Sequence, residues 1–425
     1  MRLQWVMLAG AWFLLFASAG ISAQNENVKH VALAGMVEEY FAASSDAAAD
    51  ACLNKILSSA PDPAKLLALV KKRPTELPST MEFSISHQGS TLLVGISVPK
   101  GHDFQAKALP VVFDPASDGK RWLLVPAIPV IKVAIAKFEP PPSEFTDLGR
   151  DAYLRVLRMA AWRANGDLEQ LWFTGFSWAA HASYDTALHR PDTLRGILPL
   201  GGGPRRVHFR LMPNLAGTRI LSLCGGRDDR ELIWNLKEVD RIKKRHAIDY
   251  QVIIDPDKGH RSDLAGRELA AALISNSKHR APWPRKGRLL ADMPRVENRW
   301  LRIDAVDSRK VQAPRRIPVS MSLSRDQKRR VTIKKMNKYV ARLDWLHNGG
   351  GKAPVRITLK AKAVQKAPVF LRASMVAPGR PISIQTRSTK FRKRALEIDP
   401  RVLLTEARRL GDRIDPVIAK VEVRF

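Results

Sequence analysis

The chain has 425 residues, enough for two domains, and its hydrophobic content of 45% is that of an ordinary globular protein. It contains only two cysteines, which excludes a small exported domain built on disulfides. The formal net charge is +30, and residues 291–425, with 33 basic and 12 acidic residues, carry most of it. This asymmetry predicts a domain boundary and is typical either of contact with an anionic partner or of a generally basic proteome.

The first 23 residues have the pattern of a secretory signal peptide. Arg2 precedes an apolar run from Val6 to Phe16, and small residues follow as far as Ala23. The run is too short for a comfortable membrane span, and no other apolar stretch approaches that length. We expect cleavage of residues 1–23 and a secreted or periplasmic mature protein without a membrane span; an uncleaved N-terminal anchor is the alternative.

Residues 24–74 are expected to form a helical preface. Apolar residues before Pro61–Pro63 are spaced for one helical face, and a second short helix is expected at Ala64–Lys72. From Met81 to Val98 apolar residues alternate along the chain, which predicts a β-hairpin.

Residues 75–280 are expected to form an α/β domain. Strands are expected at Leu109–Phe113, Leu171–Thr174, Leu194–Leu200, Arg219–Cys224 and Ile248–Ile254. Amphipathic helices are expected at Glu231–Arg245 and Arg261–Ile274. This alternation predicts a mostly parallel sheet with helices on both faces, in which sites lie at the carboxyl ends of the strands.

One of these strand ends carries a candidate nucleophile. The strand at Leu171–Thr174 runs into Gly175–Phe176–Ser177 and then into a helix of small residues. In such a turn the serine hydroxyl stands clear of the backbone, at the positive end of the helix. The usual pattern has glycine two residues after the serine; Ala179 nearly meets the same need for a small residue.

A serine needs a base to take its proton and an acid to orient that base. The strand that ends at Cys224 runs into Asp228 and Asp229, and the next strand runs into Asp255 and, further on, His260. A carboxylate and a histidine therefore follow two strand ends in the order serine, acid, histidine.

These motifs resemble those of the α/β-hydrolase superfamily, and more closely those of exported esterases and prolyl-oligopeptidase-like peptidases of the dienelactone-hydrolase kind. The resemblance covers roughly residues 75–278. It rests on the hairpin with Val98–Pro99–Lys100–Gly101, on Gly175–Phe176–Ser177, on Leu188–His189–Arg190–Pro191–Asp192, on Gly225-x-x-Asp228 and on Gly259–His260. It implies that Ser177 is the nucleophile, His260 the base and Asp228 the orienting acid. Asp229 stays open as the acid, because Asp228 with Glu231 also fits a helix capping box.

The resemblance implies an oxyanion hole made from the N–H of Trp178 and a second N–H from the loop 113–119. That loop departs from the family pattern. It lacks the His-Gly pair, Pro115 has no N–H, and Asp114 would place negative charge near a developing oxyanion. Asp114 or Ala116 remain as donors, and loss of one donor typically costs about 10²–10³ in turnover.

The other polar candidates are expected to have structural roles. His181 is expected to be a packed helix residue, and His102, His189 and His208 to lie on the surface. Cys224 is expected to be a buried thiol. No Cys/His cluster has metal-ligand spacing, so no metal or cofactor is expected.

The last third is expected to be a linker at 281–295 followed by a basic, β-rich domain at 296–425. Apolar residues alternate at 317–323, 331–333, 355–359 and 419–425, and one helix is expected at Arg401–Leu410. Its clusters of lysine and arginine are typical of a module that docks on an anionic polysaccharide or a cell surface; the alternative is a structural partner for the first domain.

The sequence therefore predicts an exported serine hydrolase that cleaves a small ester or a peptide bond through an acyl-enzyme. The alternative is a catalytically inactive, hydrolase-like protein that binds an anionic polymer through its basic C-terminal domain. Nucleic acid is the least expected partner, since no recognition motif is present.

Overall fold

The computed structural model describes residues 28, 30–74, 82–87, 90–103, 107–115, 128–139, 145–263, 266–277, 284–312, 317–350, 353–388, 390–393 and 395–425. The predicted signal peptide lies outside these ranges. The chain divides into two compact units, Met1–Val70 and Lys71–Phe425. Among the described residues, no helix is long and apolar enough to cross a bilayer.

The first unit is helical, as its sequence predicts. Residues 30–42 form one helix, and α2 (Asp46–Ser58) and α3 (Pro63–Lys71) follow. The break between the first two is fixed by Ser45, whose hydroxyl accepts a hydrogen bond from Ala48 N–H and caps α2.

An eight-stranded sheet forms the centre of the second unit. Its order is β1-β2-β4-β3-β5-β6-β7-β8. The hairpin β1–β2 and the β2–β4 pair are antiparallel, and all the other pairs are parallel. The strands are β1 Glu82–His87, β2 Ser90–Ser97, β3 Leu109–Asp114, β4 Ile131–Glu139, β5 Gly166–Phe176, β6 Gly196–Leu200, β7 Arg219–Gly225 and β8 Asp249–Asp255. The predicted hairpin and parallel sheet are both confirmed.

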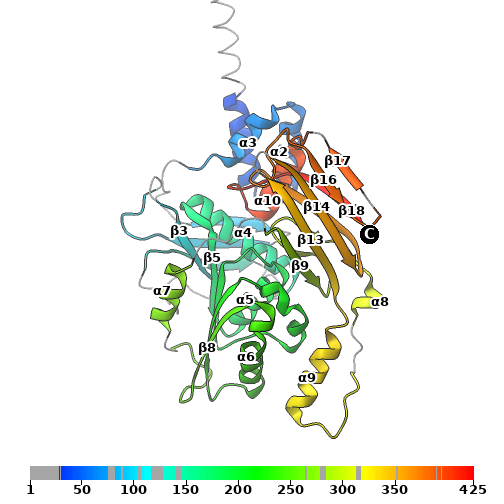
Figure 1. The fold of residues 1–425 in the computed structure, drawn as a ribbon. Coiled ribbons are helices and arrows are strands. Elements are labelled where there is room, and N and C mark those ends of the chain that lie inside the picture. Colours follow the sequence, from blue (N-terminus) through cyan, green and yellow to red (C-terminus); the bar gives the residue numbers. More distant parts are fainter. Residues whose placement is uncertain are drawn as a thin grey trace, which may run out of the picture. The chain divides into compact units, whose positions relative to one another are not determined.

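Helices cover both faces of this sheet, as the α/β pattern requires. In Figure 1, α7 (Arg267–Ser275) lies on one side of the parallel strands, and α5 (Trp178–His189) and α6 (Arg230–Ile242) lie on the other. Successive residues of β7 show why: Leu221 and Leu223 pack with α7 residues, whereas Cys224 packs with Leu232 of α6. The long helix α4 (Asp147–Arg163) adds the largest apolar face. The 3-10 helices η1 (Arg206–Leu215) and η2 (Lys244–His246) complete this region.

The region after residue 284 is mainly β. A five-stranded sheet has the order β17-β16-β14-β13-β9, and a three-stranded sheet has the order β12-β15-β18. The strands are β9 Lys286–Ala291, β10 Val296–Glu297, β11 Arg302–Ile303, β12 Ala305–Val306, β13 Ala341–Gly350, β14 Ala353–Lys362, β15 Val364–Arg372, β16 Ile382–Gln385, β17 Lys390–Lys393 and β18 Val417–Arg424. Its helices are α8 Ser308–Val311, α9 Arg325–Met336 and α10 Pro400–Leu410, the last as predicted.

The strands expected at 317–323 and 331–333 are not formed. Val331 and Ile333 lie in helix α9 rather than in a strand, because Ser324 and Gln327 form a reciprocal capping box that starts the helix. Within the expected linker, β9 pairs with β13 and places Leu290 in the core of the eight-stranded sheet. Asn214 of η1 bonds both the N–H and the carbonyl of Leu290, at 2.9 and 2.8 Å.

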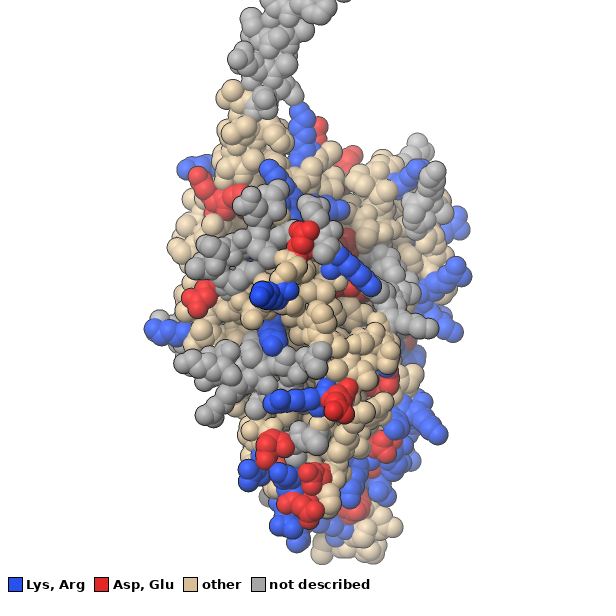
Figure 2. Space-filling view, turned by 90° about the vertical axis from the view of Figure 1, so that its left-hand side faces the viewer, with Lys and Arg blue, Asp and Glu red and all other residues tan. Residues whose placement is uncertain are grey.

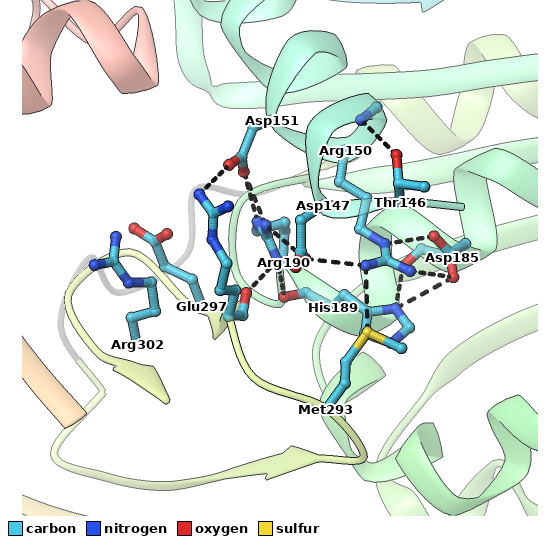
Figure 3. A network of polar contacts seen from close by, with 12 residues as sticks. Thr146, Asp147, Arg150, Asp151, Asp185, His189, Arg190, Met293, Glu297 and Arg302 are labelled. Atoms are coloured by element: carbon cyan, nitrogen blue, oxygen red, sulfur yellow. Dashed lines mark hydrogen bonds and ion pairs between the residues drawn. The ribbon is translucent and has the colours of Figure 1, made fainter. Parts of the chain in front are cut away.

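Buried polar contacts join the helices of the eight-stranded sheet to the C-terminal region, and buried ion pairs lie on each side of this junction (Figure 3). Arg190 bonds Asp151 at 3.0 Å and the backbone carbonyl of Arg295 at 2.6 Å. Glu297, only 4% exposed, accepts two hydrogen bonds from Arg409, at 2.8 and 3.1 Å. Breaking a buried pair of this kind strands one charge and typically costs about 3–5 kcal/mol.

His189 and His208 belong to this network, so the prediction that they lie on the surface is wrong. Both Nε2 of His189 and its Nδ1 face acceptors, the Asp292 carboxylate at 3.2 Å and the Asp185 carbonyl at 2.9 Å. Burial opposes a second proton, but the carboxylates of Asp185 and Asp292 outweigh it and raise the pKa of His189. In His208, Nδ1 accepts the N–H of Arg205 at 3.1 Å, and burial lowers the pKa of the ring. The surroundings therefore favour the charged form of His189 and the neutral form of His208.

Candidate active site

Ser177 sits in a strained turn between β5 and α5. Its φ and ψ are 56° and −113°, a region that costs a residue with a side chain about 1–3 kcal/mol. The turn is held by Ser177 N–H, which donates to the Leu200 carbonyl at 2.9 Å. A Cβ at Gly175 would lie 2.4 Å from that of Ala179, and one at Gly202 would lie 2.7 Å from the Ser177 carbonyl. The small residues around Ser177 are thus required by close backbone approach.

Three of the predicted residues come together at this turn. His260 Nε2 lies 3.0 Å from Ser177 Oγ, and His260 Nδ1 lies 3.0 Å from Asp228 Oδ2. A proton on Nδ1 is held by the carboxylate, which leaves Nε2 free to accept the serine proton. Asp228 is nearly buried, with a side chain 6% exposed, whereas that of His260 is 48% exposed. The acid is therefore shielded from water and the base is open to a substrate.

Close approach of two strand ends brings the acid and the histidine together. A Cβ at Gly225 would lie 2.1 Å from the Gly259 carbonyl, so only glycine lets the loops after β7 and β8 touch. Phe176 packs on the His260 ring with the centroids 4.8 Å apart. The sequence does not predict this contact of Phe176, since only its place between Gly175 and Ser177 connects it with the turn.

Asp228 and Asp229 have different partners. Asp229 is the N-cap of α6, and its Oδ1 accepts the N–H groups of Glu231 and Leu232 at 2.7 and 3.0 Å. Asp228 Oδ1 accepts the N–H of Asp229 at 2.7 Å, and its Oδ2 faces His260. Geometry therefore assigns the helix cap to one carboxylate and the histidine contact to the other.

The N-terminus of α5 carries the predicted oxyanion donor. Trp178 is the first residue of the helix, and the first N–H groups of a helix have no intrahelical acceptor. The second predicted donor, Ala116, lies outside the described residues. Asp114 is buried, and its Oδ1 lies 3.3 Å from the place that a Cβ on Gly175 would occupy. This carboxylate therefore lies against the turn.

The remaining polar candidates near the turn have structural contacts. His181 Nδ1 lies 2.5 Å from the Gly203 carbonyl, and burial lowers the pKa of its ring. Cys224 is a buried free thiol, whose pKa burial and the neighbouring Asp228 raise to about 12; Cys52 is also free. In the described ranges, no group of three or more His, Cys, Asp or Glu residues is arranged to hold a metal ion.

Comparisons with known proteins give only distant likenesses. No protein-family model and no curated protein matches the chain. Among solved structures, it is similar to the apo form of Thermogutta terrifontis esterase 2 (11% identity, 48% of this chain and 93% of that one, TM-score 0.35). It is also similar to a thermostable esterase (16% identity, 42% and 55%, 0.34) and to Porphyromonas gingivalis dipeptidyl peptidase 4 (12%, 44% and 32%, 0.32). The match spans about a third of that peptidase. The chemistry of this chain is therefore inferred from its own side chains.

Proposed function

We propose that the protein is an exported serine hydrolase that cleaves an ester or a peptide bond through an acyl-enzyme. The observation that carries the proposal is the continuous hydrogen-bonded chain from Ser177 through His260 to Asp228, with both contacts at 3.0 Å. Export rests on the predicted signal peptide.

In the proposed reaction, Ser177 Oγ attacks the substrate carbonyl carbon as its proton passes to His260 Nε2. Asp228 stays ionised and holds the imidazolium that forms. The tetrahedral intermediate then loses the alcohol or amine, which takes the proton from His260, and leaves the acyl group on Ser177. Water, deprotonated by the same histidine, releases the acid and restores the serine.

Negative charge develops on the carbonyl oxygen during attack. The Trp178 N–H and the positive end of α5 face that charge, and each such donor is worth about 10²–10³ in turnover. Short acyl esters are the first substrates to screen, because an ester has the better leaving group.

Labelling with a fluorophosphonate probe tests this proposal on the full chain. We expect wild type to be labelled, and Ser177→Ala and His260→Ala to lose labelling by about 10³-fold or more. Ser183→Ala is the matched control. Ser183 lies on the same helix but bonds only the Ala180 carbonyl within the described structure, so its loss should leave labelling intact.

Circular dichroism must show that each variant is folded. Labelling of Ser177→Ala equal to wild type would place the reactive group elsewhere. A folded wild type that reacts with neither the probe nor short esters would refute the hydrolase proposal in favour of an inactive, binding protein.

A further inference from the structure

The charged side chains on the outer face of the five-stranded sheet are almost all basic. On β14, Val355, Ile357 and Leu359 are buried, so the residues between them point to the opposite, solvent-facing side. The pairing register places the residues of the other four strands on that same side. Its basic members, here called the basic face, are Lys286, Arg288, Arg342, Arg356, Lys360, Lys362, Lys390 and Arg392.

Most of the charged side chains on the basic face have no carboxylate partner in the described structure. Asp344 is the one carboxylate at the outward positions of these strands, and it accepts hydrogen bonds from Arg288 and Arg342. The other six basic residues have no carboxylate partner among the described residues, and all six are exposed. The buried arginines are used in the opposite way, since Arg190 and Arg409 are each matched with carboxylates.

The basic face also differs from another side of the molecule. The side of the molecule that carries α7 and β8 shows acidic and basic side chains interleaved (Figure 2). On the basic face, hydrogen-bonding side chains stand between the cations instead. Ser383 lies between Arg392 and Arg356 in one cross-strand row, and Gln385 and Thr358 follow Lys390 in the next.

We propose that the basic face binds a linear polysaccharide that carries carboxylate or sulfate groups. Neighbouring strands lie about 4.8 Å apart, so Arg392 and Arg356, with Ser383 between them, are about 9.6 Å apart, and Lys360 and Lys362 are about 6.8 Å apart along β14. This regular spacing matches repeated charges on an extended chain. The intervening hydroxyl and amide groups suit sugar hydroxyls. Bound there, the polymer would hold the protein on a surface independently of the chemistry at Ser177.

Two other anionic partners fit this face less well. Single-stranded nucleic acid is usually held by aromatic side chains on which bases stack, and the outward positions of these strands contain no aromatic residue in the described structure. A lipid surface is usually bound with apolar side chains inserted beside the cations. Leu346 is the one exposed large apolar side chain at these positions, since Leu290 on the same side is buried in the core of the eight-stranded sheet.

Binding of heparin and polygalacturonate to the full chain, with uncharged dextran as the control ligand, tests the proposal. Exposed charge contacts each change an equilibrium constant about 1.5- to 5-fold, so Arg356→Gln/Lys360→Gln/Arg392→Gln should weaken binding about 10-fold. The matched variant Lys237→Gln/Arg245→Gln/Arg267→Gln removes the same charge from exposed positions on the eight-stranded sheet's helices and loops, and should bind within about twofold of wild type.

Affinity should also fall as salt rises. Equal losses in the two triple variants would show an effect of net charge alone and overturn the proposal. So would a lack of binding to both glycans at low salt, or tighter binding to anionic vesicles or to a single-stranded oligonucleotide. Thermal unfolding checks the fold, and Lys362→Gln/Lys390→Gln supplies a second face variant if the first is unstable. Activity at Ser177 should be unchanged in every variant, which separates this proposal from that for the active site.

Discussion

The two adjacent aspartates after β7 separate the acid of the site from a helix cap. Asp228→Ala removes the acceptor 3.0 Å from His260 Nδ1, so the ring loses its fixed tautomer, and turnover should fall about 10⁴-fold. Asp229→Ala removes two backbone hydrogen bonds, at 2.7 and 3.0 Å, and does not touch His260. Loss of such an N-cap costs about 1 kcal/mol, which for a unit of this size lowers the Tm by about 2 °C.

Hydrolysis of p-nitrophenyl acetate, the rate of fluorophosphonate labelling and thermal unfolding would be measured on both variants. Asp228→Asn is the isosteric check, because it keeps the volume of the buried side chain while removing its charge. We expect activity lost and the Tm nearly kept for Asp228→Asn, with the reverse for Asp229→Ala. An active Asp228→Asn enzyme together with an inactive, folded Asp229→Ala enzyme would refute the assignment.

Two further predictions concern packing at the turn and the buried ion pairs. A Cβ on Gly175 would lie 2.4 Å from that of Ala179, so Gly175→Ala should abolish labelling and lower the Tm, whereas Ala179→Gly should keep labelling and cost about 1 kcal/mol of helix propensity. A labelled, stable Gly175→Ala protein would contradict this packing. Burial alone would raise the pKa values of Asp292 and Glu297. His189 and Arg210 instead lower the pKa of Asp292 from 3.8 to about 2. Arg409 lowers the pKa of Glu297 from 4.5 to about 2. The unfolded chain therefore binds protons first as the pH falls, so stability present above about pH 5 should be lost between there and pH 2. Urea unfolding at several pH values measures this loss. Glu297→Gln should be less stable at pH 7 yet lose less on acidification, and an unchanged pH dependence would exclude Glu297 as a source.

The sequence pattern was enough to predict which side chains come close together at this edge of the sheet. Ser177, Asp228 and His260 each follow an apolar strand, and parallel strands end at the same edge of a sheet. The sequence could not decide whether Asp228 or Asp229 contacts the histidine, because both lie close to the start of α6 and either carboxylate is chemically able to cap it.

Features that depend on distant partners could not be predicted. His189 has one partner nearby in sequence, Asp185, but the other, Asp292, lies about a hundred residues further along the chain, and His208 reaches Asp185 from η1. Val331 and Ile333 alternate over too short a stretch to distinguish a strand from a helix. The capping box formed by Ser324 and Gln327 is the local feature that favours helix α9.

The two hydrogen bonds between Asn214 and Leu290 bear on how this protein can be divided. Cutting the chain before β9 would remove both backbone groups of Leu290 that Asn214 bonds, leaving it the Leu188 carbonyl alone, and would take Asp292 away from His189, inside what had been a core. The change in charge composition near residue 291 therefore does not mark a place where the chain could be cut without destabilising the fold. Residues of the basic region, through Leu290 and Asp292, help to hold η1 and α5 in place.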